Sequence, residues 1–180
     1  DGNVHRFNGF RVQHNNLLGP YKGGVRFHPQ VDLDEATALA TWMSLKTALT
    51  GLPLGGGKGG LEIDPTQYNA MDLEAVTRAF GKALAPVVGE HVDIPAPDVG
   101  TNGETMVHLL NEYQRAHGLA DDSAIGTYTG KPVGQGGSLW RNEATGYGVA
   151  LATRTMLAAC DQDLRGKTFA LQGMGNVGAS

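Results

Sequence analysis

Residues 51–64 of the chain read GLPLGGGKGGLEID and set one lysine, Lys58, among five closely spaced glycines. Glycine is used where the backbone turns with positive φ or approaches another group closely, and ordering it costs conformational entropy. Five glycines around one amine therefore predict a functional site in a loop. The run GLEID at 60–64 predicts a short strand directly after that loop.

The bulk composition limits the class of protein. The 180 residues carry a net charge of -4 and 18% of them are charged, so neither a basic nucleic-acid surface nor an acidic tail is indicated. Short apolar runs, broken by Gly, Pro and charges, predict no membrane span and no signal peptide. Cys160 is the single cysteine, which excludes an internal disulfide and favours a reducing, cytoplasmic setting.

Strand-like and helix-like segments alternate along the chain, which predicts an α/β fold with a mixed sheet flanked by helices. The expected elements, in chain order, are a hairpin turning at Asn8-Gly9, a strand at 23–28, a helix at 33–50, a strand at 60–64, a helix at 72–88, a strand directly before the turn that carries Asp98, a helix from Thr101 to Gly118, a helix at 143–159 and a strand at 167–172. Capping boxes of Asp32 with Glu35 and of Thr101 with Glu104 are expected at the starts of the first and third helices. Pro86 is expected to kink or end the second helix.

The first of these helices is expected to be buried. Its apolar residues lie on more than one face: Ala36, Leu39, Ala40, Trp42, Met43, Leu45 and Leu49. Lys46 borders the main apolar face, so we expect it to be buried together with the helix.

A lysine among glycines also suggests a phosphate-binding loop, and the spacing argues against it. A Walker A loop has Gly six residues before the Lys and Ser or Thr directly after it. In this chain Leu52 and Gly59 stand at those two positions.

Three lysines, Lys22, Lys46 and Lys58, each have a glycine-flanked or apolar setting. If the sheet brings them into one cleft, two could bind two carboxylates while the third acts as an acid or base. The alternative is that each lysine extends to solvent, as a single lysine ordinarily does. Asp98 also has two interpretations. It is either an ordinary acidic residue near a helix N-terminus, where the helix dipole favours it, or a carboxylate aimed across a cleft at the amine.

Five motifs in a fixed order carry a resemblance that covers nearly the whole chain. They read RVQHNNLLGPYKGGVRFHP at 11–29, WMSLKTALTGLPLGGGKGG at 42–60, DIPAPDVGT at 93–101, GGSLWRNEATGYG at 136–148 and LQGMGNVG at 171–178. With these motifs the sequence resembles the glutamate dehydrogenases of the glutamate/leucine/phenylalanine/valine dehydrogenase family. Several long motifs in order are much more specific than one glycine cluster.

The resemblance implies reversible oxidative deamination of L-glutamate to 2-oxoglutarate and ammonia, with hydride transfer to NAD or NADP. It implies that Lys58 is the catalytic lysine, which activates the water or carbinolamine oxygen. Asp98 matches the catalytic residue that moves a proton to or from the substrate nitrogen.

Further substrate contacts are implied by matching positions. Lys46 and Met43 match residues at the α-carboxylate end of the substrate, and Arg141 matches another residue of the substrate site. Lys22 matches the lysine that holds the side-chain carboxylate. Pro97 occupies a substrate-contact position where relatives often carry Gly, and it has no N–H to donate.

The cofactor positions follow from the same resemblance. Contact with NAD or NADP is implied for Thr145, Gly173, Gly175, Asn176, Val177 and Gly178. Residues 173–178 form G-x-G-x-x-G directly after an expected strand, which is the context that a dinucleotide-binding turn requires. The residue about 20 positions further on, which separates NAD from NADP, is not in this sequence.

Lys22 decides the substrate class. Leucine and phenylalanine dehydrogenases have an apolar residue at this position, because an ammonium facing an apolar substrate side chain would be unpaired. Glutamate is therefore favoured. The alternatives are a dehydrogenase of an apolar amino acid and a noncatalytic fragment that binds a dicarboxylate or mediates assembly.

The expected organisation has three parts: a substrate-binding and oligomerisation domain at 1–142, a connecting helix at 143–166 and the start of a Rossmann NAD(P)-binding domain at 167–180. The chain lacks an initiator Met and stops after a glycine turn, so we expect truncation at both ends and no activity from these residues alone. The resemblance implies a homo-oligomer, commonly a hexamer. No metal site, nucleic-acid partner or membrane partner is expected.

Overall fold

The computed structural model describes residues 4–120, 122–175 and 177–179, in two compact units that divide between Gly137 and Ser138. The first unit contains, in chain order, β1 (Gly9–Asn15), β2 (Tyr21–His28), α1 (Leu33–Leu49), β3 (Gly56–Glu62), α2 (Ala70–Leu84), β4 (Asp93–Pro97) and α3 (Gly103–His117). Short 3-10 helices lie at Pro65–Gln67, Ile125–Thr127 and Val133–Gln135. The second unit contains α4 (Ala144–Ala159) and the segment that follows it.

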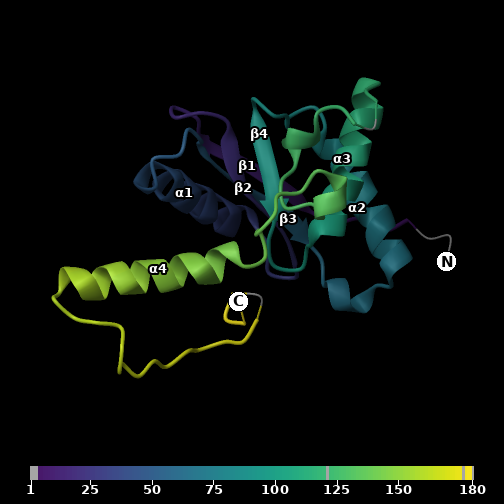
Figure 1. Cartoon of the computed structure of the whole chain (residues 1–180). Coiled ribbons are helices and arrows are strands. Elements are labelled where there is room, and N and C mark those ends of the chain that lie inside the picture. The colour runs from purple at the N-terminus through teal and green to yellow at the C-terminus, as the bar shows by residue number, and fades with distance from the viewer. Residues whose placement is uncertain (1–3, 121, 176, 180) are drawn as a thin grey trace. The chain divides into compact units, whose positions relative to one another are not determined.

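The four strands form one mixed sheet in the order β1-β3-β2-β4. Strand β3 pairs antiparallel with β1 and parallel with β2, and β2 pairs parallel with β4. Helix α1 covers one face of the sheet, and α2 and α3 lie on the other side (Figure 1). The prediction of a mixed sheet flanked by helices is confirmed.

The core lies between the sheet and the pair α2 and α3. Its buried residues are Val25, Phe27, Leu61, Ile63, Phe80, Leu84, Val88, Met106, Leu109, Leu110 and Tyr128. Phe27 of β2 meets Phe80 of α2 edge to face, with ring centroids 6.4 Å apart. This packing fixes which face of β2 points inward, and so which residues point to the opposite face.

The glycine stretch forms the inner strand β3, not a loop, so the loop prediction was wrong. None of the glycines at 55–57, 59 and 60 is among the residues with positive φ. Close approach explains them instead. A Cβ on Gly56 would collide with Ala40 and Ser44 of α1, and a Cβ on Gly57 would lie 3.2 Å from the Arg11 guanidinium.

A buried ion pair joins the two edges of the sheet. Arg11 of β1 donates through Nε to Asp93 Oδ2 of β4 at 2.7 Å, and its Nη2 contacts Asp93 Oδ1. Its Nη1 donates to the Gly24 carbonyl of β2 at 3.2 Å. The side chains are 4% and 0% exposed. Because Gly57 has no side chain, the guanidinium can lie across the inner strands.

The hairpin expected at Asn8-Gly9 is absent among the described residues. Gly9 begins β1, which pairs with β3, and the Asn8 carbonyl accepts a hydrogen bond from the Glu62 N–H at 2.9 Å. A Cβ on Gly9 would lie 2.8 Å from Leu61 Cδ2 and 3.0 Å from the Phe80 ring. Packing against the core, rather than a tight turn, requires glycine here.

The helix ends follow the sequence signals closely. Asp32 caps α1 by accepting from the Glu35 N–H at 2.7 Å, but the Glu35 side chain contacts Arg26, so the capping box is incomplete. Helix α2 ends at Leu84, before Pro86 as predicted. For α3 the capping box is formed by Asn102 with Thr105, one residue later than expected.

The burial predicted for α1 was wrong. Its buried residues are the small ones, Ala36, Ala40 and Thr47. Trp42 is 68% and Leu49 is 89% exposed, and Lys46 is also exposed. Gly56 of β3 admits a closely approaching face of small residues on α1, and the larger apolar residues point outward.

In the second unit α4 agrees with the expected helix at 143–159. Residues 167–172, predicted as a strand, pair with no strand in the described part of the chain. A strand is defined by its ladder with a neighbour, so an apolar run alone does not produce one.

We predict that Arg11→Met lowers the free energy of unfolding by about 3–5 kcal/mol, because it leaves the Asp93 carboxylate buried and unpaired. Denaturant unfolding would measure the loss. Arg115→Met is the matched control, since Arg115 is 71% exposed and its pair should contribute under about 1 kcal/mol. Equal losses in the two variants would contradict the importance given to the Arg11–Asp93 pair.

Candidate functional site

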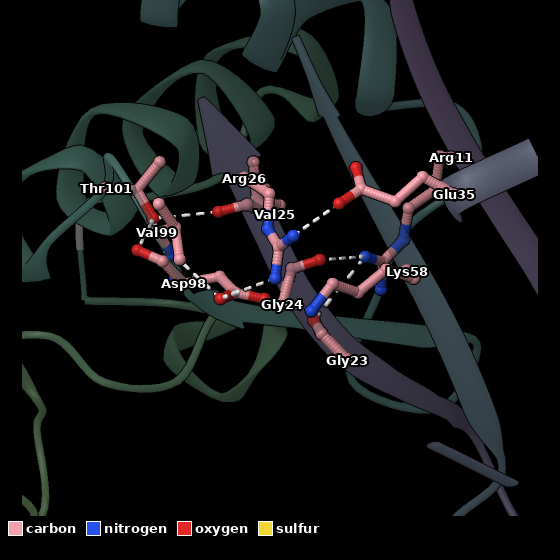
Figure 2. A network of polar contacts seen from close by, with 10 residues as sticks. All are labelled: Arg11, Gly23, Gly24, Val25, Arg26, Glu35, Lys58, Asp98, Val99 and Thr101. Carbon is pink, nitrogen blue, oxygen red and sulfur yellow. Dashed lines mark hydrogen bonds and ion pairs between the residues drawn. The ribbon is translucent and has the colours of Figure 1, made fainter. Parts of the chain in front are cut away.

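The site is built around Lys58, in the middle of β3. Its side chain is 9% exposed, and Nζ forms an ion pair with Oδ2 of Asp98, which directly follows β4. The sequence left two alternatives for Asp98, a helix-start neighbour or a carboxylate aimed at the amine. The structure agrees with the second, because the carboxylate faces Lys58. Figure 2 shows Lys58 and Asp98 within one network of polar contacts.

A tight turn after β4 fixes the Asp98 carboxylate. The Asp98 N–H donates to Thr101 Oγ1 at 2.8 Å, and that hydroxyl donates to the Val25 carbonyl, also at 2.8 Å. The Val99 N–H donates to Asp98 Oδ1 at 2.7 Å. A Cβ on Gly24 would lie 2.5 Å from Oδ2, so glycine is required beneath the carboxylate. Thr101, expected as a helix cap, instead holds this turn.

A second cation, Arg26, also faces Asp98. Arg26 lies two residues after Gly24 in β2, so both point to the same face of the sheet. Its Nη2 lies 3.6 Å from Asp98 Oδ1, and its Nη1 contacts the Glu35 carboxylate of α1. Strand alternation in GGVRFH could have identified Arg26 from the sequence, although we did not predict it.

The surroundings of Asp98 keep it ionised. Burial raises its pKa, but the hydrogen bond and charge of Lys58 lower it, as do the Val99 N–H and the Arg26 charge. The net result is a pKa below the ordinary value of 3.8. At neutral pH the Asp98 side chain is therefore a carboxylate.

Lys22 lies on the same face of the sheet as this pair. It is two residues before Gly24 in β2, and successive even positions of a strand share a face. Its Nζ donates to Thr129 Oγ1 at 2.8 Å and to the Ile94 carbonyl at 3.1 Å. Thr129 was not predicted as a partner of Lys22, because the sequence indicates only a loop there and the two residues are 107 positions apart.

A buried lysine organises the loop that carries Thr129. Lys131 is 4% exposed, and its Nζ donates to the Ile125 carbonyl at 2.6 Å and contacts the Tyr128 carbonyl. Burial lowers the pKa of Lys131, and the Glu90 charge partly opposes this. The ammonium thus closes residues 125–131 into a compact loop beside Lys22.

The other substrate positions named from the sequence are less enclosed. Helix α1 covers the same face as Lys58, because Gly56 packs on α1 and lies two residues before Lys58. Met43 of α1 is half-buried and Lys46 is exposed. Pro97 ends β4 directly before Asp98. Lys22 and Lys58 therefore lie on one face of the sheet, while the convergence of Lys22, Lys46 and Lys58 on one cleft stays a prediction.

The second unit carries the remaining positions. Arg141 precedes α4 and Thr145 lies in its first turn, and both are exposed. Val177 is also exposed. Asn176 lies outside the described residues.

Two glycines of the predicted dinucleotide-binding turn, Gly173 and Gly178, lie where a side chain would be strained or would clash. Gly173 has φ +93°, and a Cβ on Gly178 would overlap the Gly173 carbonyl. The Ala179 N–H donates to the Gly175 carbonyl at 2.9 Å, which is the spacing of one helical turn. Binding of the diphosphate of a dinucleotide at this turn stays a prediction.

The described residues contain neither a cluster of metal ligands nor a helix that could span a membrane. They contain no group of three or more His, Cys, Asp or Glu placed to hold a metal ion. Among their helices, none is long and apolar enough to cross a membrane.

Comparison with known proteins agrees with the motifs. The profile of the Glu/Leu/Phe/Val dehydrogenase dimerisation domain matches residues 1–115, and that of the Glutamate/Leucine/Phenylalanine/Valine dehydrogenase domain matches residues 136–180. The NAD-specific glutamate dehydrogenase of Clostridioides difficile is 47% identical over 179 residues, which cover 99% of this chain and 42% of that protein.

Two solved structures are similar to the chain over most of its length. The hetero-hexameric glutamate dehydrogenase from Thermus thermophilus, in its leucine-bound form, has a TM-score of 0.94 and 38% identity, covering 99% of this chain and 42% of its own. Glutamate dehydrogenase from Peptoniphilus asaccharolyticus has a TM-score of 0.90 and 46% identity, covering 98% and 44%. The chain thus spans less than half the length of these relatives. It belongs to the glutamate/leucine/phenylalanine/valine dehydrogenase family.

Proposed function

We propose that the chain is part of a glutamate dehydrogenase, which converts L-glutamate reversibly to 2-oxoglutarate and ammonia with NAD or NADP. The observation that carries the proposal is the buried Lys58–Asp98 ion pair on the same sheet face as Lys22. The stated activity of the Clostridioides and Peptoniphilus relatives supports it.

The substrate carries a carboxylate at each end, and each carboxylate needs a cation. Lys22 binds the side-chain carboxylate, because an ammonium and a carboxylate form a strong charge-assisted hydrogen bond. Lys46 and Met43 contact the α-carboxylate end, and Arg141 is proposed as another residue of the substrate site. Pro97 lines the site through its ring rather than through a backbone N–H.

Lys58 and Asp98 perform the proton transfers. The Asp98 carboxylate, ionised at neutral pH, can accept a proton from the substrate ammonium. The freed lone pair of the nitrogen can then form the C=N bond as the α-carbon loses its hydride. Lys58 donates a hydrogen bond to the attacking water or the carbinolamine oxygen and stabilises charge that develops there. Their mutual ion pair holds both groups in place before substrate binds.

NAD or NADP, when bound, accepts the hydride from the substrate α-carbon. The turn formed by Gly173, Gly175 and Gly178 would hold its diphosphate, since the backbone can approach closely there. Thr145, Asn176 and Val177 are proposed to lie near the cofactor.

We further propose the organisation inferred from the sequence: substrate domain at 1–142, connecting helix at 143–166 and nucleotide-binding domain from 167. The division between Gly137 and Ser138 supports a boundary in this region. A hexamer is supported by the hetero-hexameric Thermus relative, and a cytoplasmic setting by the lone, exposed Cys160. Because the relatives are more than twice as long, the experiments below use the complete enzyme.

We predict that Lys22→Leu lowers kcat/KM for glutamate about a hundredfold or more, because the substrate carboxylate loses its charged partner. The value for norvaline should change far less, so the ratio of the two is the measurement. Lys82→Leu, on the exposed side of α2, is the control and should leave both values unchanged. Equal losses on glutamate and norvaline would refute the role of Lys22.

We predict that Lys58→Ala lowers kcat by about 10²–10⁴, the usual contribution of a positioned acid or base. Binding of 2-oxoglutarate, measured by calorimetry, should persist, because Lys22 and Lys46 are unchanged. Turnover close to that of the parent enzyme would refute the proposed function.

A further inference from the structure

Arg26 lies between two carboxylates, one from the site and one from α1. Its Nη1 contacts Glu35 Oε1, and its Nη2 lies 3.6 Å from Asp98 Oδ1 (Figure 2). All three side chains are partly buried, between 19% and 32% exposed. The two contacts are unequal: Arg26 is hydrogen-bonded to Glu35 but stays beyond hydrogen-bond distance of Asp98.

The Glu35 carboxylate is directed at Arg26 and not at the start of its own helix. Glu35 stands three residues after the N-cap Asp32, where a glutamate ordinarily returns a hydrogen bond to the N-cap N–H. Asp32 does accept from the Glu35 N–H at 2.7 Å. The Glu35 carboxylate instead binds Arg26 of β2, so α1 is tied to the strand beside Asp98.

The chemistry of Asp98 explains why a restrained cation is useful, and this step rests on the proposed function. When Lys58 turns to the substrate oxygen, Asp98 loses its nearest counter-ion. Without any cation, a largely buried carboxylate is unfavourable. A fully engaged arginine would hold it as a permanent bidentate pair and make it a poor proton acceptor. Arg26, with Nη2 held 3.6 Å from Asp98 Oδ1, supplies a nearby positive charge without forming the bidentate pair.

The electrostatics of the free site agree with a weak second contact. Burial raises the pKa of Asp98, Lys58 contributes the largest lowering, and Arg26 contributes the smallest. The charged groups around Asp98 come from three elements: Lys58 from β3, Arg26 from β2 and, through Arg26, Glu35 from α1.

We propose that Glu35 is a positioning residue that holds the Arg26 guanidinium back from Asp98, so that Arg26 balances the carboxylate during catalysis without capturing it. Glu35 touches neither substrate nor cofactor in this scheme and acts only through Arg26. Its effect on turnover therefore depends on the presence of that arginine.

A double-mutant cycle in the complete enzyme tests this dependence. Glu35→Gln is expected to lower kcat for glutamate about tenfold, because the released arginine pairs with Asp98, while KM stays within about twofold. In an Arg26→Gln background the same Glu35→Gln change should alter kcat less than about twofold. Equal kcat losses in the two backgrounds, or no loss in either, would overturn the proposal.

The control breaks a similar pair away from the site. Glu74→Gln removes the contact between Glu74 and Arg78 within α2, where Nε and Oε1 are 2.8 Å apart, and should leave kcat unchanged. Thermal unfolding of all variants should stay close to the parent, since these side chains are partly exposed. A loss of kcat in Glu74→Gln as large as in Glu35→Gln would also overturn the proposal.

A crystal structure of the Glu35→Gln variant gives a readout that does not depend on activity. Arg26 is expected within hydrogen-bond distance of Asp98, and an unmoved Arg26 would overturn the proposal. A parent enzyme without activity on glutamate would refute the proposed function instead, while this structural test of Glu35 would still apply.

Discussion

The Arg11–Asp93 ion pair is the constraint on which the rest of the first unit depends. It joins the two edge strands, β1 and β4, on one face of a four-stranded sheet. The guanidinium crosses the inner strands, and a Cβ on Gly57 of β3 would crowd it at 3.2 Å. A buried pair of this kind is tolerated only where both charges meet and further hydrogen bonds satisfy them, as the Gly24 carbonyl does for Arg11.

The opposite face of the same inner strands carries the site. Gly24 leaves space for the Asp98 carboxylate, and Gly56 leaves space for α1. Lys58 is consequently a long side chain on a strand in which the two residues on either side of it are glycines. A reactive group on a paired inner strand is held more precisely than one on a loop. Glycines on the two faces of the inner strands thus leave space for the ion pair on one side and for Asp98 and α1 on the other.

Local signals were predictive where one short segment determines the structure. Asp32 and Pro86 mark helix ends in sequence and structure alike, and the motifs identified the family. Contacts between distant segments were not accessible. Glycines have no side chains that could alternate between the two faces of a sheet, so residues 55–60 were not recognised as a strand. The Arg11–Asp93 contact was not predicted because the two residues are 82 positions apart in the sequence. At Asn8-Gly9 the turn signal is overridden by packing on Leu61.

The two lysines that share a face differ in what they already contact, and this separates their roles. Both described acceptors of Lys22, the Thr129 hydroxyl and the Ile94 carbonyl, are neutral oxygens. In the proposed function, a substrate carboxylate is a stronger acceptor for Lys22 than either of these oxygens. Lys58 already faces the Asp98 carboxylate, whose charge repels a second carboxylate. The proposal therefore assigns an anionic substrate end to a cation other than Lys58 and leaves the Lys58 amine to the reacting centre.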